Sequence, residues 1–195
     1  MVRDVRARMV TGAMRLLATG GVQQTSIQNL TQATGTPRGS VYHFFPQGKG
    51  QLIEEALGES CRLLGSRLAE RDLSTPVAVV RAFVDVWRSL LVATDFRLGC
   101  AVVGVTVTSE NDAERRAAHQ VFSTWTTHLV DHLVRVGLCR ERAITLAHLL
   151  LAGCEGAVVL CRARRDLVPL DAVEREIVDL VSARDGADRG RELPA

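Results

Sequence analysis

The sequence predicts an all-α protein of about nine helices. Three observations lead to this class. Apolar residues recur three and four positions apart along most of the chain, helix-start and helix-stop residues separate these segments, and strand-type alternation is scarce. The chain has 195 residues, 47% of them hydrophobic, which is enough to bury a sizeable core in one or two domains.

The N-terminal segment is predicted to form a helix over residues 3–19. Its apolar side chains fall on one stripe and its arginines on the other faces. Gly20 and Gly21 follow directly, and glycine is the residue that most often ends a helix. We expect this helix to brace the two that come next.

Two short helices with a tight turn between them are predicted after this stop. Thr25 is expected to cap the first, with Gln28 reaching back to it as a capping box. Gly35 suits a tight exit from that helix. Thr36 and Pro37 then supply an N-cap and a proline at the first helical position of the second helix.

The second short helix has the composition of a recognition helix. Its first turn presents Arg38, Gly39 and Ser40, whereas Val41 and Phe45 fall on the side that packs inward. Small, polar or basic residues at the start of the second helix are typical of a DNA-binding helix-turn-helix.

Charge is divided unevenly along the chain. Residues 1–50 hold six Lys or Arg and one acidic residue, a net charge of +5, whereas the remaining residues hold 18 and 21, a net charge of −3. A cationic head on a weakly acidic body indicates that one end meets phosphate. Random scatter of arginines is the alternative explanation of the charge taken alone.

Six more helices are predicted in the rest of the chain. The segment 98–108 is ambiguous, because its β-branched residues also suit a strand, but no partner strand is visible and we expect a short buried helix. Residues 185–195 are expected to form a loose polar tail. The six helices are expected over residues 52–72, 76–91, 98–108, 109–136, 140–165 and 169–183.

Cysteine use and hydropathy indicate a cytoplasmic protein. The five cysteines are odd in number and form no C-x-x-C pair, so we expect reduced, mostly buried thiols. The N-terminus lacks the apolar core of a signal peptide. The most apolar run, 143–161, is interrupted by His148 and Glu155, and is expected to be a buried helix rather than a membrane span.

The helix-turn-helix residues together resemble the signature of TetR-family transcriptional regulators. The spacing of Phe45 to Lys49 is similar to the LmrA/YxaF-like branch of that family, as are Gly99-Cys100, Trp125 and the segments 152–157 and 162–165. The resemblance is dense over the N-terminal quarter. Its residues are Thr25, Ser26, Ile27, Leu30, Gly35, Thr36, Arg38 to His43, Phe45, Lys49 and Leu52.

The resemblance implies a TetR-like homodimer. Residues 1–50 would form the helix-turn-helix DNA-binding domain and residues 51–195 the effector-binding and dimerisation domain. The dimer interface would consist of the last two helices, from Arg140 to Arg165 and from Pro169 to Ala183. Small residues in the segment 152–157 would let helices approach closely. The alternative is that the first of these helices is a core helix of one subunit.

A double-stranded DNA operator is the expected partner of the head. Hydroxyl and ammonium groups are expected to bind phosphates, whereas residues of the second helix are expected to reach base edges or adjacent phosphates. Arg38 is the best candidate for reading guanine, because a guanidinium addresses two acceptors at once. The alternative for Tyr42 and His43 is that they form an aromatic pair with a purely structural role. The phosphate set is Thr25, Ser26, Tyr42 and Lys49, and the base set is Thr36, Arg38, Gly39, Ser40 and His43.

A small hydrophobic or aromatic effector is the expected partner of the body. The family resemblance places seven residues around its cavity, although each alone also suits an ordinary core. Glu155 or a histidine would add a polar anchor. The seven are Phe83, Trp87, Val103, Val107, Phe122, Trp125 and His128.

Enzyme function is the main competing class. His128 and His132 stand four residues apart, as helical metal ligands do, but no third ligand converges with them. Phosphate-loop, nucleophile-elbow and paired-carboxylate patterns are missing from the sequence. We therefore expect that the protein is not an enzyme and has no cofactor, metal site or membrane partner. We expect a repressor that its effector releases from DNA. Two other functions remain as alternatives: an activator, and a dimerising module that does not bind DNA.

Overall fold

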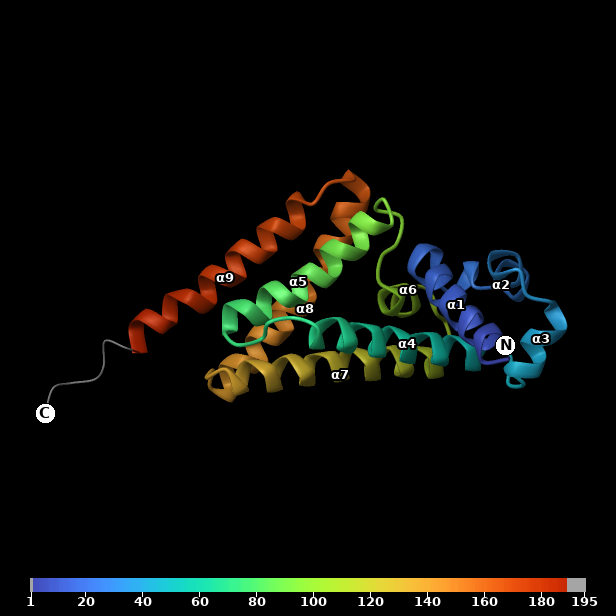
Figure 1. The fold of residues 1–195 in the computed structure, drawn as a ribbon, viewed down its shortest axis with the longest axis horizontal. Coiled ribbons are helices and arrows are strands. Elements are labelled where there is room, and N and C mark those ends of the chain that lie inside the picture. The colour runs from blue at the N-terminus through green and yellow to red at the C-terminus, as the bar shows by residue number, and fades with distance from the viewer. Residues whose placement is uncertain (1, 189–195) are drawn as a thin grey trace, which may run out of the picture. The chain divides into compact units, whose positions relative to one another are not determined.

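The computed structural model describes residues 2–188, and in that range the chain forms nine α-helices and no strand (Figure 1). The all-α prediction is therefore confirmed. The helices are α1 (Val2–Gln24), α2 (Ile27–Thr34), α3 (Arg38–Phe44), α4 (Lys49–Ala69), α5 (Pro76–Ala93), α6 (Ala101–Thr108), α7 (Asp112–Arg135), α8 (Arg140–Arg164) and α9 (Val168–Asp188).

Local start signals place several of these helices correctly. The Thr75 hydroxyl accepts a hydrogen bond from the Ala78 amide at 3.0 Å, and Pro76 follows at the first helical position of α5. The ambiguous segment 98–108 is helical from Ala101 onward, and α6 buries Val102 and Val105. At the C-terminus the expected tail begins too early, because α9 runs to Asp188. The rest of that tail lies outside the described residues.

The first helix is broken at the expected glycine pair. Gly20 and Gly21 have non-helical backbone angles within α1, and Gly21 has φ 69° and ψ −160°. Side chains strongly disfavour this positive-φ conformation, so glycine is required there. Residues 22–24 continue as a separate helical turn that leads into α2.

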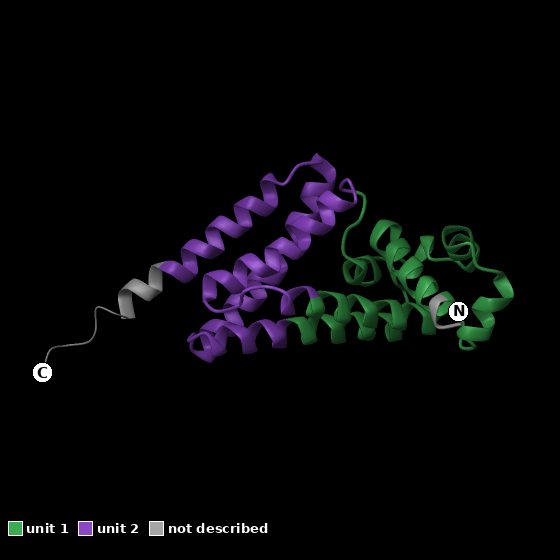
Figure 2. Cartoon of the chain, viewed as in Figure 1, with its two compact units in different colours: residues 1–66, 97–125 green, residues 67–96, 126–195 purple. Residues whose placement is uncertain are grey.

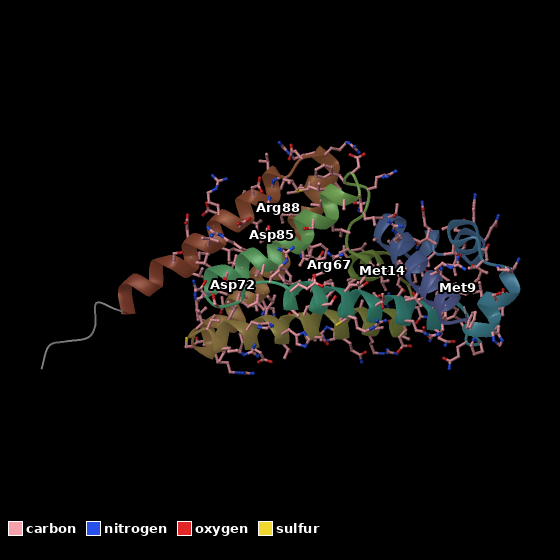
Figure 3. All side chains as sticks on the ribbon, viewed as in Figure 1. Met9, Met14, Arg67, Asp72, Asp85 and Arg88 are labelled. Carbon is pink, nitrogen blue, oxygen red and sulfur yellow. The ribbon has the colours of Figure 1, made fainter. Side chains whose placement is uncertain are left out.

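The chain packs as two compact units (Figure 2). The first contains residues 1–66 and 97–125, and its core includes Met9 of α1 (Figure 3), which is fully buried. The second contains residues 67–96 and the described residues from 126 onward, with α5, α8 and α9 in mutual contact. The functional division at residue 50 stays a prediction, because these units describe packing alone.

Helix α8 is buried along one face. Leu146, Leu150, Cys154 and Val158 are among its buried residues, whereas other apolar side chains of the same helix are exposed. Among the described helices, α8 alone is long and apolar enough to span a membrane, a test that a core helix of a soluble protein also passes. The expectation of a buried helix is therefore correct for only part of its circumference.

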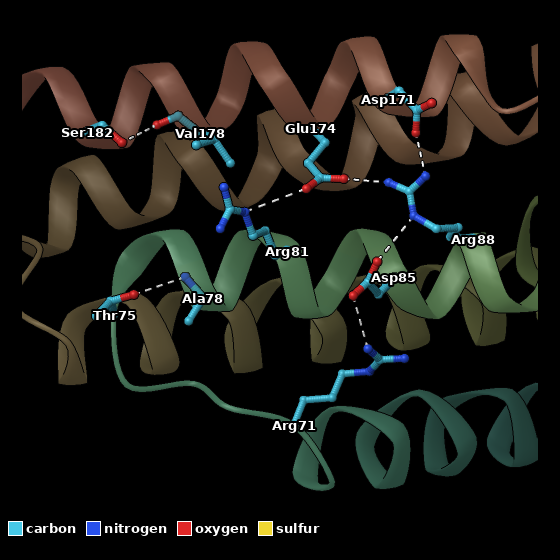
Figure 4. Close-up of polar contacts among 10 residues, drawn as sticks. All are labelled: Arg71, Thr75, Ala78, Arg81, Asp85, Arg88, Asp171, Glu174, Val178 and Ser182. Carbon is cyan, nitrogen blue, oxygen red and sulfur yellow. Dashed lines mark hydrogen bonds and ion pairs between the residues drawn. The ribbon is translucent and has the colours of Figure 1, made fainter.

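A network of ion pairs joins α5 to α9 in the second unit (Figure 4). The Arg88 guanidinium contacts Asp85, Asp171 and Glu174. Burial disfavours its charge, but the hydrogen bonds that Arg88 donates to Asp171 and Asp85, together with the negative charges of Asp171 and Glu174, outweigh burial and raise the pKa of Arg88 above its ordinary value. Arg81 also pairs with Glu174, at 3.7 Å. Arg88 thus ties α9 to α5 through two carboxylates of α9.

Candidate nucleic-acid interface

Helix α2 is capped by Ser26 rather than by Thr25. The Ser26 hydroxyl accepts a hydrogen bond from the Asn29 amide at 3.0 Å. Thr25 is 0% exposed, and its hydroxyl donates to the Gly21 carbonyl at 2.9 Å. The predicted cap is therefore wrong by one residue. The buried Thr25 hydroxyl is bonded to Gly21, and its contact with phosphate stays a prediction.

The turn between α2 and α3 follows the expected course with one shift. Gly35 ends α2 in the left-handed conformation, with φ 65°. Pro37 occupies the N-cap position of α3. Thr36 is 4% exposed and its hydroxyl pairs with that of Thr34 at 2.6 Å. Thr36 is thus not the cap of α3, and its contact with DNA stays a prediction.

Helix α3 presents one exposed polar face. Arg38, Gly39 and His43 are exposed, and Tyr42 is half-exposed, at 50%. These positions follow one another at the spacing of a single helical face. Ser40 is half-buried beside them.

The opposite side of α3 anchors it to the first unit. Val41 and Phe45 are buried, as expected from the sequence. The Arg6 guanidinium lies 5.7 Å from the centre of the Phe45 ring, and it also pairs with Glu55 at 2.6 Å. No local sequence pattern points to these contacts of Arg6, because both partners lie far from it along the chain.

Lys49 lies at the first residue of α4, half-buried. Its ammonium donates to the Val22 carbonyl at 2.6 Å. The sequence predicts a phosphate contact for this residue and does not anticipate the bond to Val22. An ammonium carries three N–H donors, so two remain for other acceptors.

This arrangement suits the chemistry of duplex DNA. A helix with an exposed guanidinium, imidazole and phenol on one face can enter a major groove, where base edges offer acceptors. The hydroxyl of Ser26 and the ammonium of Lys49 lie in the segments that flank α2 and α3. Phosphate contacts of this kind fix the register of the protein on the duplex.

Comparison with known proteins assigns the chain to a family. Residues 10–56 match the model of bacterial regulatory proteins of the tetR family, and residues 76–176 match the LmrA/YxaF-like C-terminal domain of transcriptional regulators. An HTH-type transcriptional regulator of Mycobacterium tuberculosis is 37% identical over 185 residues, covering 91% of this chain and 94% of the relative.

The chain belongs to the TetR family of transcriptional regulators.

Solved structures of TetR regulators share its fold. A TetR transcriptional regulator from Chloroflexus aurantiacus has a TM-score of 0.74 and 26% identity, covering 93% of this chain and 96% of the other. A regulatory protein TetR from Rhodobacter sphaeroides has a TM-score of 0.78 and 21% identity, with coverages of 88% and 96%. DNA binding through a helix-turn-helix and a regulatory rather than an enzymatic role follow from this membership.

The aromatic residues predicted around an effector form two pairs in this TetR-family chain. Phe83 and Trp87 lie in the second unit with ring centres 6.4 Å apart and nearly perpendicular planes. Phe122 and Trp125 form a similar pair in the first unit, at 5.7 Å. Both tryptophans are buried.

The other predicted effector residues do not all lie in the interior. Val103 is half-buried, but Val107 is 73% exposed and His128 is exposed. Val107 and His128 are therefore not enclosed in this structure, and their place around an effector stays a prediction. The apolar residues of α6 surround the whole helix, so the sequence pattern does not select its inner face.

Cys61 is a neighbour of Trp125 that the sequence did not single out. Burial raises the pKa of the Cys61 thiol, and a hydrogen bond with the Trp125 side chain partly offsets the rise. Cys100, Cys154 and Cys161 are buried, and Cys139 is exposed. Burial also raises the pKa of Cys154 strongly.

The histidine pair of α7 lacks the surroundings of a metal site. Within the described part of the chain, no three His, Cys, Asp or Glu side chains gather as metal ligands. Desolvation lowers the pKa of His132, and the nearby charges of Arg135 and His128 lower it further. The His132 Nδ1 lies 3.2 Å from the Arg135 guanidinium.

Proposed function

We propose that this chain is a cytoplasmic, homodimeric repressor that binds a two-fold symmetric operator and is released from it by a small hydrophobic or aromatic effector. The observation that carries the proposal is the exposed face of α3, which presents Arg38, Tyr42 and His43 while Val41 and Phe45 anchor the helix. Residues 1–50 would be the DNA-binding domain, and residues 51–195 the domain for effector and dimerisation.

In the proposed complex α3 lies in the major groove. Arg38 reads guanine, and Gly39, Ser40 and His43 lie against base edges or adjacent phosphates. Ser26, Tyr42 and Lys49 bind phosphates on either side. Thr25 and Thr36 support this surface from within through their hydrogen bonds to Gly21 and Thr34.

The exposed face of α8 supports a dimer. Its exposed residues recur three and four positions apart, which puts them on one side of the helix. Ala152 and Gly156 lie in the middle of that side and permit close approach of a second helix. Leu180 adds exposed apolar surface on α9. The face of α8 comprises Leu149, Ala152, Gly156, Val159 and Leu160.

The two aromatic pairs support an apolar effector. Each pair contains a buried tryptophan, so an effector that packs against either ring would quench its fluorescence. An effector that binds the DNA-free conformation better must weaken operator binding by the same factor, because coupling between two ligands is reciprocal.

Repression rather than activation has support from a relative. The DhaR protein of Mycobacterium sp. strain GP1, 24% identical over 177 residues, is named an HTH-type transcriptional repressor. An activator would bind the same kind of operator, and a reporter gene under the bound promoter distinguishes the two.

A genomic-fragment selection tests the proposal. Purified protein is mixed with sheared genomic DNA that includes its own upstream region, and retained fragments are sequenced. We expect fragments that share an inverted repeat, loss of retention for the Arg38→Ala variant, and release by an apolar compound that quenches tryptophan fluorescence. Retention of random fragments alone would refute the operator proposal.

A further inference from the structure

The break in α1 interrupts one backbone hydrogen bond in particular. In a continuous helix the Val22 amide would donate to the Ala18 carbonyl, four residues earlier. The angles at Gly20 and Gly21, with φ 69° and ψ −160° at Gly21, are incompatible with that bond. Both groups therefore need other partners.

Both partners come from the segment 99–108, which contains α6. The Gly99 amide donates to the Ala18 carbonyl at 3.0 Å. The Val22 amide donates to the Thr108 hydroxyl at 2.9 Å, and that hydroxyl donates in turn to the Gly104 carbonyl at 2.6 Å. The two ends of this segment thus replace the two halves of the interrupted bond.

The fit between α6 and the break is close. A Cβ atom on Gly104 would collide with the Leu17 carbonyl oxygen, and a Cβ atom on Gly21 would collide with the Thr108 side chain. The side-chain amide of Gln23 also donates to the Thr108 carbonyl, at 2.8 Å. Segment 99–108 is therefore seated on the break itself.

Val22 connects this seat to the DNA-binding elements. Its amide is bound by Thr108 of α6, and its carbonyl accepts from Lys49 of α4 at 2.6 Å and from the Thr25 amide at 3.2 Å. Ser26, the cap of α2, directly follows Thr25 in the chain. The place where α2 begins thus depends on the bonds with which Thr108 and Lys49 hold Val22.

We propose that Thr108 is a positioning residue for DNA binding, which acts through Val22 and touches no DNA itself. Its hydroxyl accepts the Val22 N–H that the break in α1 leaves without a helical partner. This bond fixes the direction of the chain from Val22 into α2 and α3. This inference rests on the proposed operator-binding function, and one arm of its test needs no DNA.

The test compares Thr108→Val with Thr106→Val. Thr106 lies on the same helix, exposed, and its hydroxyl donates only within α6, to the Val102 carbonyl at 2.8 Å. Amide exchange measured by NMR reports the Val22 bond directly. Fluorescence anisotropy with a labelled duplex retained in the genomic selection reports operator affinity.

Thr108→Val is expected to speed Val22 amide exchange and to weaken duplex binding, each by about tenfold, because a part-buried N–H loses its acceptor. Thr106→Val should match the wild type in both measurements. Thr108→Ser keeps the hydroxyl and should restore both. If Thr108→Val lowers helicity as well, the Ser variant alone decides, since rescue by a hydroxyl requires this bond.

Unchanged Val22 exchange in Thr108→Val would overturn the inference, as would faster exchange with unchanged duplex affinity. Failure of the wild-type protein to bind any selected duplex would instead refute the operator proposal, and the exchange arm would still report whether Thr108 holds Val22.

Discussion

Arg38 and Lys49 carry positive charge to the head in two different ways. Arg38 is exposed at the first residue of α3, where its planar guanidinium is unobstructed. Lys49 is half-buried, and its ammonium donates one hydrogen bond to the Val22 carbonyl. The first is suited to read a base and the second to hold a phosphate close to the fold.

Replacing Arg38 with Ala should weaken operator binding by about 1–3 kcal/mol and relax the preference for guanine at one position of each half-site. Affinities for the selected duplex and for duplexes with single base changes measure both effects. Arg116→Ala is the matched control, because Arg116 is exposed on α7 in the same unit. An equal loss on every duplex would assign Arg38 to a phosphate instead.

Replacing Lys49 with Met should weaken binding equally on all sequences and lower the slope of log affinity against log salt by about one unit. The slope is obtained from titrations at several salt concentrations. A fall in affinity with an unchanged slope would show that Lys49 acts only through its bond to Val22.

Single residues also show what the sequence could and could not predict. The start of α5 was predictable, because Thr75 and Pro76 carry a signal that is complete within a few residues. The cap of α2 was misplaced by one residue, since Thr25 and Ser26 both offer a hydroxyl. The bond between Val22 and Thr108 joins residues 86 positions apart, and no local pattern announces such a pair.

At the level of elements, helices are held by two different kinds of contact. Helix α9 is tied to α5 by the ion pairs of Arg88. Helix α6 is tied to α1 by the Thr108 hydroxyl, which accepts from the Val22 amide, and by Gly104, whose missing Cβ lets α6 lie against the Leu17 carbonyl. The sequence predicted each of these helices but not its partner, because periodicity identifies a helix and not the surface against which it packs.

Arg88→Met should lower the free energy of unfolding by about 1–3 kcal/mol, because several charge-assisted hydrogen bonds are lost and Asp85, Asp171 and Glu174 are left close together. Urea unfolding followed by circular dichroism measures the change. Arg175→Met on the exposed side of α9 is the control and should stay within about 0.5 kcal/mol of the wild type. Equal effects of the two substitutions would contradict the role of Arg88.

Gly104→Ala should destabilise the protein by about 1–3 kcal/mol despite the better helix propensity of Ala, because its Cβ would press against the Leu17 carbonyl. Gly65→Ala in α4 has open space around it and should be neutral or stabilising by up to about 1 kcal/mol. The same urea titration compares them. A stabilised Gly104→Ala variant would show that α6 is not seated against α1.

At the level of the whole molecule, the apolar face of α8 relates the single chain to its proposed dimer. The sequence showed a helix that is apolar nearly all round, and the structure buries one side and leaves Leu149, Val159 and Leu160 exposed. Exposed apolar residues on one helical side favour an interface. Two copies of α3 in one dimer require an operator with matching two-fold symmetry.

Footprinting on a selected fragment tests whether a two-fold symmetric dimer binds the operator. The wild-type protein should protect two inverted half-sites whose centres lie about 34–36 Å apart, or a multiple of that distance. Leu160→Glu, which places a charge on the exposed face of α8, should lose the joint protection, whereas Gln120→Glu on the exposed surface of α7 should keep it. Protection of a single asymmetric site by the wild type, or of no site, would contradict the account.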